Sequence, residues 1–129
     1  MKKKGIVYLT VLALVCGLLV GCGGHKEKDN MKIYYINALG DGIGAVGYHM
    51  HATKTDAMID EALQELEKDP NSVEYRRTIS DSVKIEDCVL DDGMLSLYFD
   101  REYEELTGYT EVLMRAAIVK TLVQIKGID

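Results

Sequence analysis

Apolar residues recur at three- and four-residue spacing over residues 110–126, which predicts a long α-helix. Thr110 is placed to cap its N-terminus, and Gly127 to end it in a left-handed backbone conformation. The polar side is narrow, and Glu111 and Arg115 form an i,i+4 pair on it. We therefore expect other parts of the fold to cover most of this helix.

A second helix is predicted to begin at Thr55 and to end before Asp69 and Pro70. Its apolar residues form one stripe, and the remaining positions are polar or charged. The stripe consists of Met58, Ile59, Ala62, Leu63 and Leu66. This pattern is typical of an amphipathic helix that packs one face against a core.

A β-hairpin is predicted with strands over residues 83–90 and 94–99. Asp91, Asp92 and Gly93 supply a turn of the Asp-Gly type, and the alternation of the first strand slips near Asp87 as a β-bulge would cause. On the second strand Leu95, Leu97 and Phe99 share one side, and Met94, Ser96 and Tyr98 share the other. One face of the hairpin is therefore expected to join the core.

Residues 32–36 predict a further strand, because they are rich in β-branched and aromatic side chains. Residues 37–47 contain four glycines and predict a loop, and residues 48–52 predict a short strand or an extended arm. Polar connections are expected at residues 71–82 and 100–109. The sequence thus predicts an α+β fold in the order β-α-β-β-α, with two helices packed on one face of a small, mostly antiparallel sheet.

The first 22 residues carry the pattern of a bacterial lipoprotein signal peptide. Three lysines precede an apolar segment over residues 5–20, which is short for a membrane span, and Leu19-Val20-Gly21-Cys22 follows directly. We expect residues 1–21 to be removed and Cys22 to carry lipid, in preference to an uncleaved anchor helix. The protein would then be attached to the outer side of the cell membrane by its acyl chains, palmitate among them.

The remaining chain is expected to form a linker over residues 22–31 and a single domain over residues 32–129. Without the three lysines of the signal peptide, 12 basic residues stand against 21 acidic ones, a net charge of −9. This balance argues against nucleic acid as a partner, because phosphate binding requires a basic face. Cys88 would be the one remaining thiol, and its apolar neighbours favour a core position over a catalytic role.

Several segments together resemble the GerMN domain of sporulation and spore-germination lipoproteins. They are ALQEL at 62–66, VKI at 83–85, LDDGML at 90–95, LYFD at 97–100 and RAAIVKTL at 115–122. The resemblance covers about residues 32–129. It implies a non-catalytic module of an envelope assembly, with a fold similar to that of ring-building modules of sporulation channels. Such domains usually have a further strand after the second helix, so we expect either a truncated sequence or an exposed sheet edge.

Candidate catalytic and metal-binding residues are few, and neither a cofactor nor an enzymatic activity is expected. His49 and His51 alternate so that both imidazoles lie on one face of a strand, where His25 could approach them, but we expect solvated histidines rather than a metal site. The acidic residues at 91–92 and 102–105 are expected to lie on the surface. The glycines at 40, 42 and 44 predict a flexible loop rather than a phosphate-binding one.

A contact surface is predicted at Tyr75, Arg76 and Arg77, because tyrosine and arginine are enriched in interfaces. The alternative is that such tyrosines are partly buried with polar tips. Two functions follow. The first is a protein–protein assembly module that docks on another envelope protein by this patch or by a sheet edge; the second is a module that binds cell-wall glycan (peptidoglycan) through tyrosines stacked on sugar rings.

Overall fold

The larger sheet is built around strand β1 (Met31–Asn37). In the computed structural model, which describes residues 27–129, β1 pairs antiparallel with β2 (Ile43–Tyr48) along its length and with β3 (Tyr75–Arg76) at its end. The strand order is β2-β1-β3. The predicted signal peptide and Cys22 lie outside the described residues.

Strand β2 corrects the prediction of a loop over residues 37–47. Only residues 38–42 form the connection, and β2 contributes to the sheet from Ile43 onward. The glycines concealed this strand because they remove the side chains whose alternation would have indicated it. Gly44 has a packing role, since a Cβ atom there would meet the ring of Tyr75. Of the short strand or extended arm predicted at 48–52, only Tyr48 belongs to a strand, as the last residue of β2, and residues 49–52 form an arm outside the sheet with no helix or strand.

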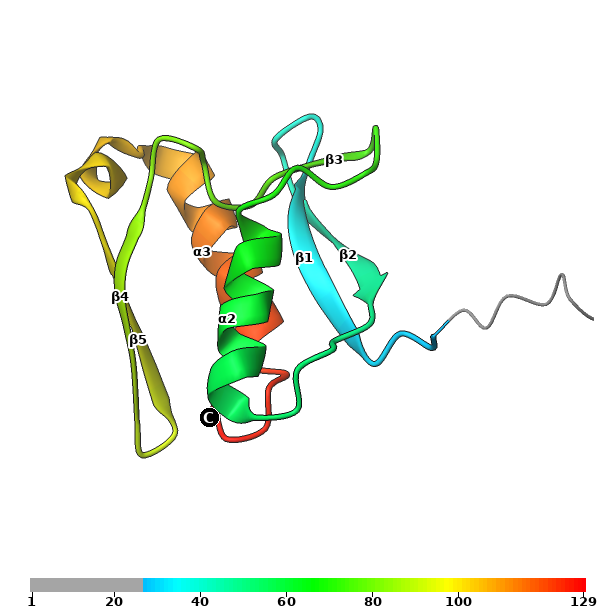
Figure 1. Ribbon diagram of the computed structural model, residues 1–129. Helices are drawn as coiled ribbons and strands as arrows, with labels where there is room; N and C mark the ends of the chain where they lie inside the picture. Colours follow the sequence, from blue (N-terminus) through cyan, green and yellow to red (C-terminus); the bar gives the residue numbers. More distant parts are fainter. Residues whose placement is uncertain (1–26) are drawn as a thin grey trace, which may run out of the picture.

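Two helices lie between this sheet and a separate β-hairpin (Figure 1). Helix α2 (Thr55–Leu66) agrees with the prediction, and its buried side chains are Ile59, Ala62, Leu63 and Leu66. Helix α3 (Gly108–Leu122) begins two residues earlier and ends four residues earlier than predicted. Its N-cap is Thr107 rather than Thr110, and residues 123–127 form turns, with Gly127 at φ 103° beyond the helix end.

The hairpin consists of β4 (Ile85–Asp91) and β5 (Met94–Phe99), and it confirms its prediction closely. The register shifts between Ile85 and Asp87, where the bulge was expected. Asp92 and Gly93 both have positive φ, 47° and 83°, as the two central residues of a type I′ turn require. On β5, Leu95, Leu97 and Phe99 pack against the core, and Met94 and Tyr98 are exposed.

The predicted α+β class with antiparallel strands and two helices is confirmed, but the strands divide into two sheets. A short 3₁₀ helix, η1 (Arg101–Glu105), connects the hairpin to α3. The core lies where both helices meet β1, and side chains such as Ile33, Leu66 and Met114 are almost completely buried there. Among residues 27–129, no helix is both long and apolar enough to cross a bilayer.

The free edge of β1 is covered by side chains instead of a strand. The side-chain amide of Gln124 donates to the carbonyl of Lys32 at 2.7 Å, and its oxygen accepts from the Lys32 amide at 3.1 Å. The buried hydroxyl of Thr121 accepts from the Tyr34 amide at 3.0 Å, and Thr78 donates to the Tyr34 carbonyl at 2.6 Å. The backbone groups on this edge of β1 therefore have hydrogen-bond partners up to the point where β3 pairs with it, although no neighbouring strand lies along that part of the edge.

Candidate functional site

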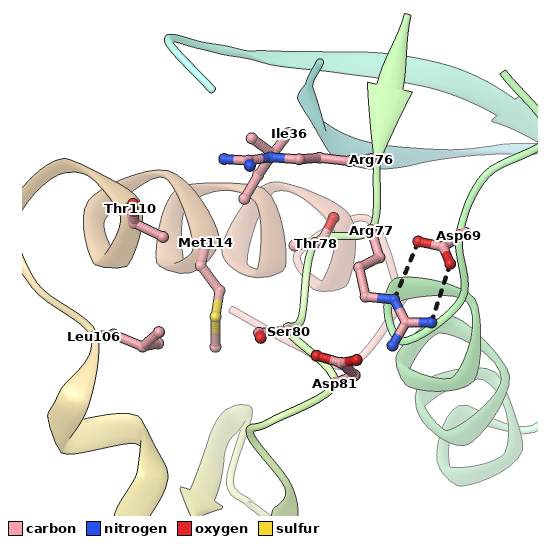
Figure 2. Close-up of a pocket in the computed structure, with 10 residues that line it drawn as sticks. All are labelled: Ile36, Asp69, Arg76, Arg77, Thr78, Ser80, Asp81, Leu106, Thr110 and Met114. Carbon is pink, nitrogen blue, oxygen red and sulfur yellow. Dashed lines mark hydrogen bonds and ion pairs between the residues drawn. The ribbon is translucent and has the colours of Figure 1, made fainter. Parts of the chain in front are cut away.

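A hollow of about 380 Å³ lies beside β3 and contains two residues of the predicted contact patch (Figure 2). Its walls come from the ends of β1 and α2, from the segment after β3, and from the first turns of α3. The lining side chains are Ile36, Asp69, Arg76, Arg77, Thr78, Ser80, Asp81, Leu106, Thr110 and Met114. Seven of these ten residues carry a charged group or a hydroxyl, so the hollow offers hydrogen-bond partners to a ligand beside its apolar side chains.

The two arginines point in opposite directions within this hollow (Figure 2). Arg77 turns toward α2, where its Nε and Nη2 donate to the two carboxylate oxygens of Asp69, each at 3.2 Å. Arg76 lies against the backbone of Gly40, and in residues 27–129 it forms no ion pair. Of the two arginines, Arg76 is therefore the one whose guanidinium is available to an external anion or hydrogen-bond acceptor.

Tyr75 does not belong to the same surface. Its ring lies on the backbone of Gly44 and beside Tyr35, with ring centroids 6.4 Å apart and a tilt of 32°. The side chain is half-buried. The structure therefore supports the alternative of a partly buried tyrosine at this position, and it separates Tyr75 from the two arginines.

An apolar strip on α3 was missed by the sequence analysis, which expected most of that helix to be covered. Val112, Val119 and Val123 are 47%, 52% and 48% exposed. Two hollows of about 190 and 350 Å³ run between α3 and β5 beside the strip, lined mainly by leucine, isoleucine and valine. Only the register of α3 against the hairpin determines which valines stay uncovered, so helical periodicity alone could not identify them.

The histidines at the end of β2 lie close together, as their alternation predicted. The ring centroids of His49 and His51 are 5.1 Å apart, and both Nε2 atoms face the carboxylate of Glu27. The two carboxylates that contact them, those of Glu27 and Glu61, were not identified from the sequence. No local signal indicates them, because the fold brings them from separate segments. His25 lies outside the described residues.

Glu61 is the most highly hydrogen-bonded carboxylate of this region. Its oxygens accept from the His51 amide at 2.9 Å, the Ala52 amide at 2.8 Å and the Tyr48 hydroxyl at 2.8 Å. Desolvation by burial raises the pKa of Glu61, but hydrogen bonds from the His51 backbone and side chain, from Tyr48 and from Ala52 outweigh it and lower the pKa to about 2. Glu61 is therefore ionised and holds the arm after β2 against α2.

The other candidate residues have structural surroundings. Cys88 is half-buried, and desolvation together with the nearby charges of Asp60, Asp87 and Asp56 raises the pKa of its thiol. A raised pKa leaves little thiolate, the form in which cysteine attacks. The acidic side chains at 91–92, 102 and 104–105 are exposed, as expected. Of the three glycines considered for a phosphate loop, Gly40 has φ 73° in the β1–β2 turn and Gly44 belongs to β2.

The comparison with known families agrees with the fold and with the segments that carry the resemblance. A family model described as Germane, sporulation and spore germination, matches residues 32–129. No curated protein and no solved structure matches the chain. The match covers both sheets, both helices and the hollows described above, and it spans well over half of the sequence. The chain therefore belongs to the Germane family of sporulation and spore germination domains.

Proposed function

We propose that this protein is a non-catalytic, lipid-anchored module that assembles with another envelope protein outside the cytoplasm, during sporulation or spore germination. The family match supports the biological setting. The observation that carries the assembly role is the valine strip of α3, defined by Val112, Val119 and Val123, together with the apolar hollows beside it. Uncovered apolar surface of this kind marks interaction sites.

The strip has the composition of an interface. Val112 and Val119 lie seven residues apart on α3, and Val123 at its C-cap keeps helical backbone angles, φ −67° and ψ −10°, so the three valines share one side. Charged side chains border it, including Arg115, whose side chain is 65% exposed although it pairs with Glu111 at 3.2 Å. An apolar centre with a charged rim is the usual arrangement of protein–protein contact surfaces.

Photo-crosslinking in intact cells tests the assembly role. A photoreactive residue at position 119 should yield an adduct that protease digests and that peptide mapping resolves into a second protein. Position 89 is the matched control, because Val89 is 43% exposed on β4 and is not among the residues that line the hollows beside α3. Equal yields from positions 119 and 89, or no protein adduct from 119, would reject the strip as the contact surface.

Attachment through Cys22 is supported by the sequence Leu19-Val20-Gly21-Cys22. Metabolic labelling with palmitate should mark the wild-type protein and leave Cys22→Ser unlabelled. A nine-residue connection from Cys22 to β1 would span at most about 30 Å, so the domain would remain near the membrane surface. Labelling of Cys22→Ser to the wild-type level would contradict the proposed anchor.

Binding of cell-wall glycan is the second candidate, and the polar hollow in Figure 2 favours it. Arg76 and the hydroxyl and carboxylate groups of Ser80 and Asp81 offer the donors and acceptors that a saccharide requires. Purified protein should then be retained by isolated sacculi, and Arg76→Ala should reduce retention, whereas Lys54→Ala, at the opposite end of α2 and outside the hollow, should not. Absence of retention at low salt would exclude this candidate.

A further inference from the structure

We propose that Glu27, His49 and His51 bind a divalent transition-metal ion, zinc in the first place, and that the ion fastens the segment before β1 to the arm after β2. These three residues are called the His-Glu cluster below. The proposal is independent of the assembly role.

The ligand atoms of the His-Glu cluster already converge. His49 Nε2 lies 3.1 Å from Glu27 Oε2, and His51 Nε2 lies 3.9 Å from the same oxygen. One ligand atom from each residue lies within 4.8 Å of the others. Ligands at about 2.0–2.1 Å around a tetrahedral zinc ion stand roughly 3.3 Å apart, so a small closure completes the site. Glu27 and His51 can supply it, because their side chains are 65% and 69% exposed.

The fold fixes the approach of the two chain segments. Met50 is buried between the histidines, which directs His49 and His51 together toward the outer side. Asn30 holds the preceding segment in place: its side-chain Oδ1 accepts from the Met50 backbone amide at 2.8 Å, and its backbone N–H donates to the Tyr48 carbonyl at 3.1 Å. The hydrogen bonds of Asn30 therefore keep Glu27 close to the histidines, and none of them involves a metal-ligand atom of the His-Glu cluster.

Both imidazoles are oriented by their second nitrogen. His49 Nδ1 lies 2.9 Å from the carbonyl oxygen of Lys28, and His51 Nδ1 lies 3.0 Å from Oε1 of Glu61. Because a carbonyl oxygen and a carboxylate oxygen accept hydrogen bonds, each Nδ1 is the donor in these contacts, which leaves Nε2 as the ring nitrogen that can coordinate an ion. In the structure Nε2 of both rings faces the Glu27 carboxylate, and the ion would bind between them. Metal-binding histidines are typically held in this manner, by a carboxylate or a backbone carbonyl on the other ring nitrogen.

The ligand set selects the class of metal. Two imidazoles with one carboxylate suit zinc, copper or nickel, whereas magnesium and calcium prefer oxygen ligands throughout. Three protein ligands leave one tetrahedral position for water or for a group from outside. The binding energy of the ion would stabilise the contact between residues 27–30 and the arm after β2.

Calorimetric titration of the full-length chain in detergent with ZnCl₂ tests the proposal, with a purification tag that contains no histidine. One zinc ion per chain is expected, and MgCl₂ should give no heat of binding. His49→Gln, His51→Gln and Glu27→Gln should each weaken zinc binding at least tenfold. Glu61→Gln should weaken it about 10–100-fold by releasing the His51 ring. Each variant is first compared with the wild type by circular dichroism without metal, so that a loss of folding is recognised.

Glu65→Gln is the matched control, since Glu65 lies one turn from Glu61 on α2 and outside the His-Glu cluster; its zinc affinity should equal that of the wild type. Substitution of cobalt for zinc should give visible absorption bands of tetrahedral intensity, which His51→Gln should abolish. Zinc binding that survives the double change of His49 and His51 to Gln, or no saturable binding to the wild type, would overturn the proposal and leave only an ion pair at Glu27.

Limited trypsin digestion tests whether the ion holds the segment before β1 against the arm after β2. Zinc should slow cleavage after Lys28 in the wild type and in Glu65→Gln, and it should have no effect in His51→Gln. Zinc binding without this protection would refute the structural consequence, because the ion would then be held without joining the two segments.

Discussion

The side chain of Gln124 replaces a neighbouring strand for Lys32. Its amide group donates to the Lys32 carbonyl at 2.7 Å and accepts from the Lys32 amide at 3.1 Å, the paired exchange that two strand residues make. The same amide also donates to the carbonyls of Lys120 and Thr121 at the end of α3. Gln124 thus joins the C-terminal end of α3 to the open edge of the sheet.

Gln124→Ala should lower the free energy of unfolding by about 1 kcal/mol, because two partly exposed hydrogen bonds to β1 are lost. Urea denaturation followed by circular dichroism measures this change. Gln64→Ala, on the exposed side of α2, should change stability by less than about 0.5 kcal/mol. Equal effects of the two substitutions would contradict the role of Gln124. The Gln124→Ala protein should also self-associate more readily at high concentration, because the edge becomes available for strand pairing.

Thr121→Val should destabilise the domain by about 1–3 kcal/mol although the two side chains have nearly the same volume. The Thr121 hydroxyl donates to the Ala117 carbonyl at 2.8 Å and accepts from the Tyr34 amide, and valine leaves that partly buried amide without this partner. Thr121→Ser keeps the hydroxyl and should retain most of the stability. A serine variant as unstable as the valine variant would indicate that packing, rather than hydrogen bonding, matters at this position.

Gly44→Ala should cost about 1–3 kcal/mol, because the new methyl group would displace the ring of Tyr75 from the sheet. In the double variant with Tyr75→Ala the glycine substitution should cost much less. Urea denaturation of the four proteins in this mutant cycle gives the coupling energy directly. Additive effects would contradict the contact between Gly44 and Tyr75.

Cys88 should react slowly with iodoacetamide at pH 8, and its rate should rise at a higher pH than the rate of the urea-unfolded chain. Burial and the charges of three aspartates raise the pKa of the folded thiol, so less thiolate is present at a given pH. Mass spectrometry of the peptide that contains Cys88 follows the reaction. The midpoint of the pH profile separates a shifted pKa from reduced access, since access alone lowers the rate without moving the midpoint. Coincident midpoints would refute the shift.

The sequence was most informative where local chemistry determines the structure. The hairpin was predicted with its turn, its bulge and its buried face because Asp92-Gly93 and the alternation of Leu95, Leu97 and Phe99 act over a few residues. Helix α2 was located by its stripe and its Asp69-Pro70 stop. The ends of α3 were less certain, since apolar residues continue to Ile125 after the helix has ended at Leu122.

The remaining features depend on contacts between distant segments. Strand β2 was missed because Gly44 and Gly47 carry no side chains that could indicate a strand, although β1 pairs with them. The division into two sheets depends on where the chain turns after Arg76, which no local pattern determines. Similarly, Tyr75 and Arg77 were expected on one patch, but the packing of Tyr75 on the sheet and the pairing of Arg77 with Asp69 separate them.

The covered edge of β1 also affects how the domain opens in its native state. Successive amides of a strand point to opposite sides, so those of Lys32 and Tyr34 are held by Gln124, just beyond α3, and by Thr121 in its last turn, and their neighbours face β2. Fraying of the last turn of α3 would expose the first set to hydrogen exchange while the ladder to β2 stays closed. The backbone amides of β1 therefore belong to two groups, one bonded to the helical part and one bonded to β2. Their hydrogens can exchange with solvent on different timescales.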